Sequence, residues 1–469
     1  MFFHRINQPD LSINTYLLGD MQTKRCAVID PTRLTDRIIE YTQANGLEIS
    51  YILETHVHAD FVSGSKELKH LLKGKPIIGC SKMGGLEWSP AYADLLISDG
   101  DEIDLGSIRL KARHTPGHTP EHLIWLCYDK SRSLDVPWFS FTGDLLFVGG
   151  IGRPDLLGKE KFIELSKQLY QSLFQRLADL PDSLEIFPAH GAGSLCGKSM
   201  SMRSSSTLGY ERRFNLALKG MPEEIWIAKQ QKEMPAPPAY FQRMKKINVQ
   251  GPKLSSEIEK TPKELSWDEL KEMLSSEIFL IDIREPETFA RKHLKGSVNI
   301  PIGSTFGNWL GMVIRYDIPV VLILPKADMA KSLKELLWVM GIDDYVGYAI
   351  WNDRETDVEY QDFPVAAVND LAEQIQRQGE SLFILDVRTP SEWNSGHIEQ
   401  AHHIQLAELP NLINQIPRDK PIATLCGGGF RASIAASLLQ KEGFSHMENV
   451  KGGMQAWQKA GLPTIKEER

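Results

Sequence analysis

The chain has 469 residues, which is enough for about three domains of ordinary size. Its 61 acidic and 53 basic residues leave a formal net charge of −8, and nothing in the sequence indicates the basic patch of a nucleic-acid-binding protein. No apolar run approaches the about 20 residues of a membrane span, and residues 1–10 lack the apolar core of a signal peptide, so we expect a cytoplasmic protein that binds neither nucleic acid nor membrane.

The first candidate site follows a predicted strand at 49–53. Two histidines stand two residues apart there, an aspartate follows, and three later segments each place one polar residue beside a glycine at an apolar run. The candidate ligands are His56, His58, Asp60, His118, Asp144 and His190. A lone histidine is more often a core or capping residue than a ligand. Imidazole and carboxylate groups are the preferred ligands of zinc and iron, and four such segments in this order predict a metal centre at strand ends.

The sequence beyond a polar, turn-rich linker at 250–262 contains an internal repeat. Residues 278–289 parallel residues 382–393, and each copy alternates apolar strands with amphipathic helices. This alternation predicts two α/β units, each around a mainly parallel sheet, with a junction near 351–358.

The second copy contains a cysteine loop suited to sulfur chemistry. A predicted strand at 421–425 leads into Cys426, and a predicted helix follows at 432–439. The N-terminus of that helix and the charge of Arg431 stabilise a thiolate, and three glycines let the backbone close around a bound sulfur. The candidate catalytic residues are Cys426, Gly427, Gly428, Gly429 and Arg431.

The first copy lacks this loop, because Leu324 stands in the place of the cysteine and the glycines and arginine are missing. It cannot form a persulfide by this route, and we expect a structural or docking role. The alternative is some new chemistry carried by Lys326 and Asp328.

The spacing Cys426-x-x-Gly429-x-Arg431 resembles the six-residue active-site loop of the rhodaneses, which are sulfurtransferases. Further matches at 382–393 and 452–457 extend the resemblance over about 365–466. The resemblance implies that Cys426 carries a sulfane sulfur, and that the first copy is a degenerate rhodanese.

The order of the N-terminal candidates resembles the metallo-β-lactamase fold, an αββα sandwich, and specifically its glyoxalase II and persulfide dioxygenase branch. The two-metal pattern His-x-His-x-Asp-His breaks at Phe61, which replaces a nitrogen ligand by an apolar ring and weakens the second metal site. The resemblance to persulfide dioxygenases implies one Fe(II) per chain, with zinc as the alternative, held by His56, His118 and Asp144. The residues left to orient ligands or waters are His58, Asp60 and His190.

Two further segments match the same branch. Gly149–Asp155 follows Asp144, and we expect Arg153 and Asp155 to brace the metal-side loop by an ion pair. Cys196 lies six residues after His190, and it is either a persulfide carrier facing the metal or an ordinary loop cysteine. The five cysteines are few and far apart, which fits a reducing cytosol better than disulfides. The three interpreted as core residues are Cys26, Cys80 and Cys127.

These resemblances predict a metallo-β-lactamase-fold persulfide dioxygenase domain over 1–248, a degenerate rhodanese-like domain over 262–355 and an active rhodanese domain over 362–469. They imply Fe(II)-dependent oxidation of a low-molecular-weight thiol persulfide by O₂ to sulfite and thiol, coupled to sulfur transfer through Cys426 that interconverts sulfite and thiosulfate. Such chemistry belongs to hydrogen sulfide detoxification. The family also implies a homodimer or homotetramer.

Two alternatives remain. The first is a zinc-dependent, glyoxalase II-like thioester hydrolase fused to a sulfurtransferase, against which Phe61 argues. The second is a non-catalytic sulfur carrier or redox sensor that uses Cys426 and Cys196, against which the intact set of metal ligands argues.

Overall fold

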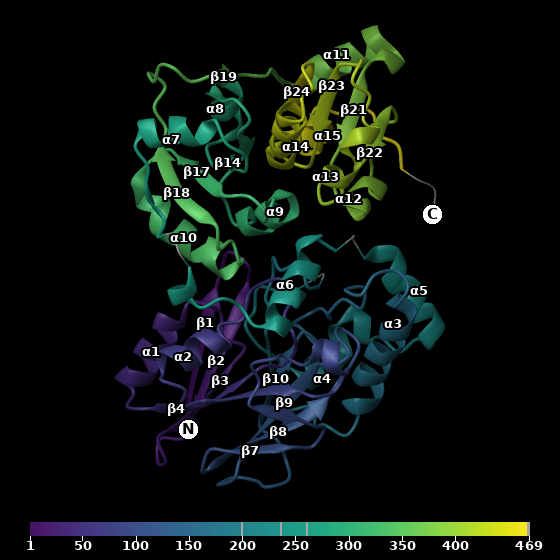
Figure 1. The fold of residues 1–469 in the computed structure, drawn as a ribbon. Coiled ribbons are helices and arrows are strands. Elements are labelled where there is room, and N and C mark those ends of the chain that lie inside the picture. Colours follow the sequence, from purple (N-terminus) through teal and green to yellow (C-terminus); the bar gives the residue numbers. More distant parts are fainter. Residues whose placement is uncertain (198–199, 235–236, 259–260, 467–469) are drawn as a thin grey trace. The chain divides into compact units, whose positions relative to one another are not determined.

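A computed structural model describes residues 1–197, 200–234, 237–258 and 261–466, and the chain divides into two compact units (Figure 1). The first unit comprises Met1–Ile258 and Trp338–Gly341, and the second comprises Glu259–Leu337 and Ile342–Arg469. Among the described residues, none of the helices combines the length and apolar composition needed to cross a membrane.

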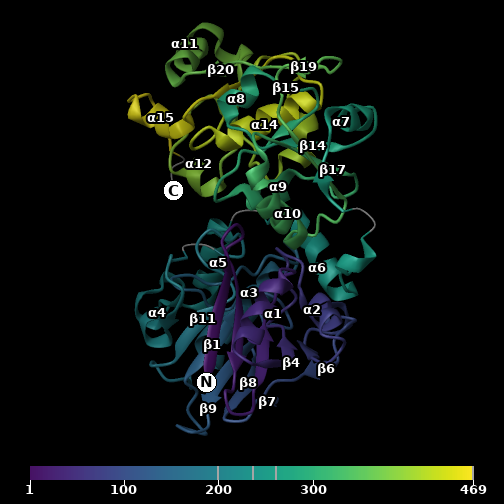
Figure 2. The same cartoon turned by 90° about the vertical axis from the view of Figure 1, so that its left-hand side faces the viewer.

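The first unit is built on two mixed sheets of six strands each. In spatial order, the first sheet contains β1 (Phe2–Gln8), β2 (Ile13–Gly19), β3 (Arg25–Ile29), β4 (Glu48–Leu53), β5 (Ile77–Ser81) and β6 (Leu95–Ile97). The second contains β12 (Ser206–Thr207), β11 (Glu185–Pro188), β10 (Phe139–Gly143), β9 (Leu123–Asp129), β8 (Ile108–His114) and β7 (Glu102–Asp104). The edge strand β1, purple in Figure 2, is antiparallel to β2, whereas the pairs from β3 to β6 are parallel.

Helices cover the outer faces of these two sheets, so the layers run helix, sheet, sheet, helix (Figure 1). The helices of this unit are α1 (Thr35–Ala44), α2 (Ser65–Leu71), α3 (Phe162–Gln171), α4 (Leu208–Phe214), α5 (Glu223–Glu233) and α6 (Tyr240–Gln250). Buried and partly exposed side chains alternate along β8. Ile108 and Leu110 are buried between the sheets, where they pack with Tyr16, Trp125 and Phe141. Burial of each such side chain stabilises the fold by about 2 kcal/mol. The arrangement confirms the predicted αββα sandwich.

The second unit contains the two repeat copies, each on a parallel five-stranded sheet. The first sheet contains, in spatial order, β13 (Lys263–Glu264), β18 (Tyr345–Ile350), β17 (Val320–Leu324), β14 (Phe279–Asp282) and β16 (Val298–Asn299). The second contains β20 (Val365–Ala366), β24 (Met447–Val450), β23 (Ile422–Leu425), β21 (Phe383–Asp386) and β22 (Ala401–His403). Numbered within its own copy, each sheet has the strand order 1-5-4-2-3, which confirms the repeat. A separate two-stranded ribbon pairs β15 (His293–Leu294) with β19 (Tyr360–Gln361).

The two copies share more than strand order. Each ends its second strand in a buried ion pair, with 2.6 Å between Arg284 Nη2 and Asp282 Oδ2 and 2.7 Å between Arg388 Nη2 and Asp386 Oδ2. The helices of the first copy are α7 (Trp267–Leu274), α8 (Pro286–Arg291), α9 (Phe306–Val313) and α10 (Ala330–Val339). Those of the second are α11 (Val368–Gln378), α12 (Pro390–Asn394), α13 (Leu409–Leu412), α14 (Phe430–Lys441) and α15 (Gly453–Lys459).

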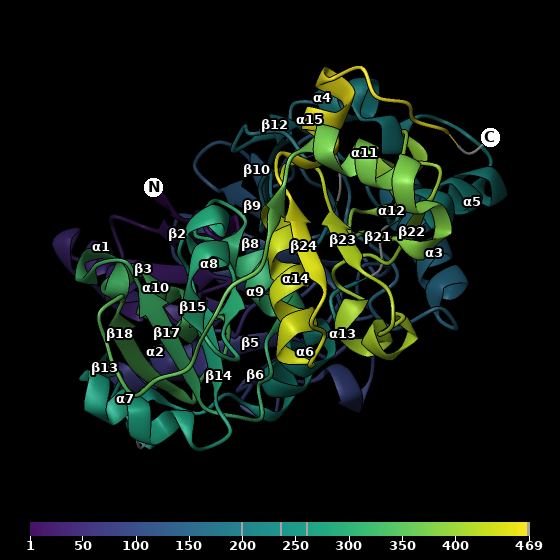
Figure 3. The same ribbon diagram turned by 90° about the horizontal axis from the view of Figure 1, so that it is seen from above.

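Helix α14 lies between the two sheets of the second unit (Figure 3), and buried hydrogen bonds tie it to the first copy. The Ser433 hydroxyl donates to Asn299 Oδ1 at 2.6 Å, and the Asn299 backbone N–H donates to Ser437 Oγ at 3.0 Å. The Asn299 amide also donates to the carbonyl oxygens of Asp282 and Arg284. The copy without a cysteine therefore holds the helix that follows the cysteine loop of the other copy.

We expect Asn299→Ala to weaken α14, because it leaves the buried Ser433 hydroxyl without an acceptor. The local cost is about 2 kcal/mol. Hydrogen exchange followed by mass spectrometry is the measurement, and α14 amides should exchange faster in the variant. The exposed Asn414→Ala is the control and should leave α14 unchanged. Equal α14 protection in both variants would contradict this role of Asn299.

Candidate metal centre and cysteine loop

Three buried side chains of the first unit direct atoms at one place. His56 Nε2 lies 3.8 Å, and His118 Nε2 3.4 Å, from Asp144 Oδ2. Within the described part of the chain, none of these three atoms has a hydrogen-bond partner. Buried polar atoms are normally paired, and two imidazole nitrogens with one carboxylate oxygen form a donor set for zinc or iron. The three residues therefore fit a single metal ion.

Strand ends deliver all three residues. His56 follows β4, His118 follows β8, and Asp144 follows β10. The turn before Asp144 requires glycine, because Gly143 has a φ of +50° and a Cβ there would lie 2.6 Å from His122 Nε2.

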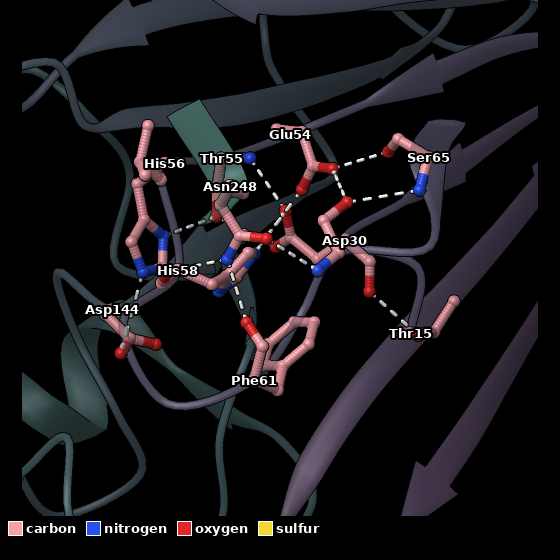
Figure 4. A network of polar contacts seen from close by, with 12 residues as sticks. Thr15, Asp30, Glu54, Thr55, His56, His58, Phe61, Ser65, Asp144 and Asn248 are labelled. Atoms are coloured by element: carbon pink, nitrogen blue, oxygen red, sulfur yellow. Dashed lines mark hydrogen bonds and ion pairs between the residues drawn. The ribbon is translucent and has the colours of Figure 1, made fainter. Parts of the chain in front are cut away.

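The second ring nitrogen, Nδ1, of both His56 and His118 makes a hydrogen bond, as Figure 4 shows for His56. His118 Nδ1 donates to the carbonyl oxygen of Arg153 at 2.9 Å. His56 Nδ1 donates to Thr55 Oγ1 at 2.9 Å, because the Thr55 hydroxyl itself donates to Asp30 Oδ2 at 2.8 Å. Burial lowers the pKa of both imidazoles. Each Nε2 is thus left with a free lone pair for a metal.

His58, the second histidine of the motif, belongs to a separate polar cluster (Figure 4). Its Nε2 lies 3.2 Å from Asp30 Oδ1 and 3.5 Å from Glu54 Oε2. Burial lowers the pKa of His58, but the two carboxylates outweigh burial and raise it well above its ordinary value. The Asn248 amide donates to the carbonyl oxygens of His58 and Phe61, both at 2.8 Å, and fixes the loop between them. The predicted orienting role of His58 stays a prediction.

His190 bridges two carboxylates. Its Nδ1 lies 2.6 Å from Asp144 Oδ1 and its Nε2 lies 2.8 Å from Asp60 Oδ2. These contacts outweigh burial and raise the pKa of His190 to about 10. The Cys196 sulfur lies within 4.8 Å of a ligand atom of Asp60 and of His190, and burial and both carboxylates raise the pKa of its thiol. The structure thus places Cys196 beside Asp60 and His190, and the raised pKa favours its thiol over its thiolate.

Phe61 is fully buried, and its ring centroid lies 4.3 Å from that of His58 and 6.4 Å from that of His190. An apolar ring therefore occupies the place where the two-metal pattern has a histidine.

The expected ion pair of the metal-side loop is present. Arg153 Nε lies 2.6 Å from Asp155 Oδ1, and Arg153 Nη2 lies 2.7 Å from Asp155 Oδ2. The Arg153 backbone accepts from His118 and donates to the carbonyl oxygen of Cys196 at 3.1 Å. The loop consequently connects one candidate ligand to the cysteine.

Four residues around this centre were missing from the sequence prediction. Asp30 and Glu54 each follow an apolar strand directly, and this position was a usable signal. His122 lies in the same segment as His118, and its Nε2 accepts from the Asp144 backbone N–H at 3.0 Å. Asn248 lies on α6, far along the chain, and no local pattern marks it.

The cysteine loop joins β23 to α14, as predicted. The Gly429 N–H donates to Cys426 Sγ at 3.0 Å, and Gly429 adopts a φ of +98°, which favours glycine. Two backbone N–H groups at the start of α15 donate hydrogen bonds to the loop. The Met454 N–H donates to the carbonyl oxygen of Cys426, and the Gln455 N–H donates to the carbonyl oxygen of Gly427. The sulfur therefore faces inward, and Cys426 is buried.

Arg431 lies beside this loop, but it is not a free charge. It makes two hydrogen bonds with Glu392, at 2.8 and 2.6 Å. In the first copy Leu324 is buried, and Lys326 and Asp328 form an ion pair of 3.1 Å between side chains that are 70% and 61% exposed. An exposed pair of this kind contributes little, and nothing about it indicates catalysis.

Comparisons with known proteins match the αββα sandwich and the two repeat copies to separate families. The metallo-beta-lactamase superfamily model matches residues 9–190, and the rhodanese-like domain model matches 266–349 and 367–460. The mitochondrial persulfide dioxygenase ETHE1 of Mus musculus is 32% identical over 231 residues, which cover 49% of this chain and 81% of the mouse protein. The human protein of the same name is 37% identical over 177 residues, which cover 38% of this chain and 63% of the human protein.

Among solved structures, a metallo-beta-lactamase from Staphylococcus aureus shares 34% identity, with a TM-score of 0.66, and the match covers 75% of this chain and 98% of that one. The persulfide dioxygenase relatives and the rhodanese-like domains indicate an enzyme of sulfur metabolism. The chain belongs to the metallo-beta-lactamase superfamily as a homologue of the ETHE1 persulfide dioxygenases, and two rhodanese-like domains follow its metallo-beta-lactamase domain.

Proposed function

We propose that the chain oxidises a low-molecular-weight thiol persulfide with O₂ to sulfite and thiol, and that Cys426 transfers sulfane sulfur. The observation that carries the first activity is the convergence of three buried, unpartnered atoms from His56, His118 and Asp144. Fe(II) held there would supply open coordination positions and the redox chemistry that O₂ requires and that zinc lacks. Residues 1–248, 262–355 and 362–469 remain the proposed domains.

The protein's own part in the oxidation is to hold the donor atoms in place. Burial raises the pKa of Asp144, but His190 and His118 outweigh burial and lower it, which favours the carboxylate form. His190 occupies one Asp144 oxygen and leaves the other for the metal. Phe61 and Phe147, each with its ring centroid 6.4 Å from that of His190, present apolar surfaces that keep water from this side. In this proposal Cys196 remains a candidate sulfur relay.

The geometry of the cysteine loop supports sulfur transfer at Cys426. The Cys426 thiolate attacks the outer sulfur of R–S–SH, a new S–S bond forms, the old S–S bond breaks, and R–S⁻ leaves with the electron pair. The Gly429 N–H donates to the Cys426 sulfur and stabilises its negative charge before the attack. A nucleophilic acceptor then takes the outer sulfur and restores the thiolate. With sulfite as the acceptor, the product is thiosulfate.

Single substitutions should separate the two activities. We expect Cys426→Ser to abolish sulfur transfer, at least 100-fold, because serine cannot hold a persulfide. We expect it to leave O₂ uptake with glutathione persulfide within twofold, as measured with an oxygen electrode. His118→Ala should do the reverse. The core substitution Cys127→Ala is the control and should retain both activities. Loss of both activities in Cys426→Ser alone would show instead that the sites work only when coupled.

Metal analysis tests the identity of the centre. Protein purified without oxygen should contain about one iron per chain, and His118→Ala should lose most of it, because it removes one of three ligands. Two zinc ions per chain together with cleavage of glutathione thioesters would overturn the proposal in favour of the hydrolase.

The hydrogen bond behind His56 should contribute to metal affinity. We expect Thr55→Val to weaken Fe(II) binding by about tenfold, because His56 Nδ1 loses its acceptor. Competition with a chromophoric chelator under anaerobic conditions is the measurement. Thr42→Val, which also removes a buried hydroxyl but on α1, is the matched control. Equal affinities in the two variants would contradict a role of Thr55.

A further inference from the structure

Helix α6 carries a half-buried lysine beside the loop of the candidate metal centre. Lys245 lies one turn before Asn248, whose amide donates to the carbonyl oxygens of His58 and Phe61 (Figure 4). Residues three apart share one side of a helix, so Lys245 lies on the side of α6 that faces this loop. Within the described part of the chain, the Lys245 amine forms no ion pair and no hydrogen bond.

An aromatic ring holds the Lys245 ammonium in place of a carboxylate. Lys245 Nζ lies 3.7 Å from the ring centroid of Trp88, which is a cation–π contact. Trp88 is buried, and its Nε1 has no hydrogen-bond partner among the described residues, although buried indole N–H groups normally have one. Burial lowers the pKa of Lys245, and the carboxylates of Glu87 and Glu121 oppose this shift. The ammonium thus has carboxylates near it but none bound to it.

Glu121 connects this lysine to the candidate metal centre. Glu121 lies three residues after His118 and is buried. Its Oε1 accepts from the backbone N–H of Val57 at 2.7 Å, and Val57 directly follows His56. One carboxylate therefore contacts the segments that supply two of the three candidate metal ligands.

Glu121 and Trp88 lie on two sides of one glycine. Gly84 has a φ of +75°, and a Cβ there would lie 3.0 Å from Glu121 Cβ and 3.2 Å from Trp88 Cβ. Glycine allows this close approach. The second oxygen of Glu121, Oε2, is buried and has no hydrogen-bond partner in the described part of the chain. Beside the metal centre the protein thus presents an ammonium and an indole N–H as donors and a carboxylate oxygen as an acceptor, each uncommitted.

We propose that Lys245, Trp88 and Glu121 bind the carrier part of the thiol persulfide. The Lys245 amine and the Trp88 indole N–H take a carboxylate of the carrier, and Glu121 Oε2 takes one of its N–H groups. The carrier class is therefore an amino-acid or peptide thiol, which bears both groups. This inference rests on the proposed persulfide oxidation. Contacts to the remote part of a substrate hold its reacting atom in position, which here is the outer sulfur at the metal centre.

Lys245→Met tests the proposal, because methionine keeps an apolar stem against Trp88 but removes the charge. We expect the KM for glutathione persulfide in O₂ uptake to rise about tenfold, since a charge-assisted hydrogen bond is lost. The kcat and the iron content should stay within twofold. The persulfide of glutathione diethyl ester, in which both carboxylates are masked, should react equally with the variant and the unaltered chain. Lys245→Arg retains the charge and should return the KM toward that of the unaltered chain.

A binding measurement tests the same residue without turnover. In anaerobic calorimetric titrations with glutathione, the thiol product, we expect Lys245→Met to raise the Kd about tenfold for the same reason. Lys246→Met is the matched control, because it makes the same substitution at the next residue of α6, whose side chain is exposed. It should change neither the KM nor the Kd.

The ester separates recognition of the carboxylate from a structural role. Equal rises in KM for glutathione persulfide and for its diethyl ester would overturn the proposal, because Lys245 would then act only by packing. Loss of iron in Lys245→Met, or an unchanged KM and Kd, would overturn it as well. Absence of O₂ uptake with both persulfides in the unaltered chain would instead refute the proposed oxidation, and the titration with glutathione would still decide whether Lys245 binds the carrier.

Discussion

The candidate metal centre of the first unit depends on the two carboxylate oxygens of Asp144. Asp144 gives one oxygen to His190, at 2.6 Å, and keeps the other unpaired toward His56 and His118. A buried carboxylate is costly unless it is compensated, so this arrangement requires the protonated His190 on one side and favours a cation on the other. The strands that end at this point, and the turn at Gly143, are the means by which the sandwich brings these groups together.

Much of this could be predicted from sequence because the relevant signals are local. Histidines and aspartates at strand ends marked the candidate metal centre, and a glycine-rich loop between an apolar strand and a helix marked Cys426. The repeat predicted two parallel sheets because apolar periodicity and the Asp–Arg pairs recur at the same places in both copies. Strand order within each copy is a tertiary property, and it emerged only from the pairing of strands.

The parts that escaped prediction depend on partners far apart in sequence. The direction of His58 is set by Asp30, which lies on another strand end, and the charge of Arg431 is cancelled by Glu392, 39 residues upstream. No spacing rule connects such pairs. Helix α6 runs to Gln250, past the predicted boundary at 248, and Asn248 on it bonds to the loop of His58. A predicted boundary can therefore pass through a residue on which the site depends.

The helix after the cysteine loop makes the second copy depend on the first for its burial. Every residue from Ala432 to Leu439 on α14 is buried, and alanine and serine predominate, so the helix lacks the solvent-facing polar stripe of an ordinary surface helix. Side chains from both copies cover it, and Asn299 of the first copy bonds to two of its serines. The first copy, which has Leu324 at the place of the cysteine, thus forms part of the interior that supports the cysteine loop of the second copy. Deleting the first copy would therefore expose α14, the helix on which the Cys426 loop is built.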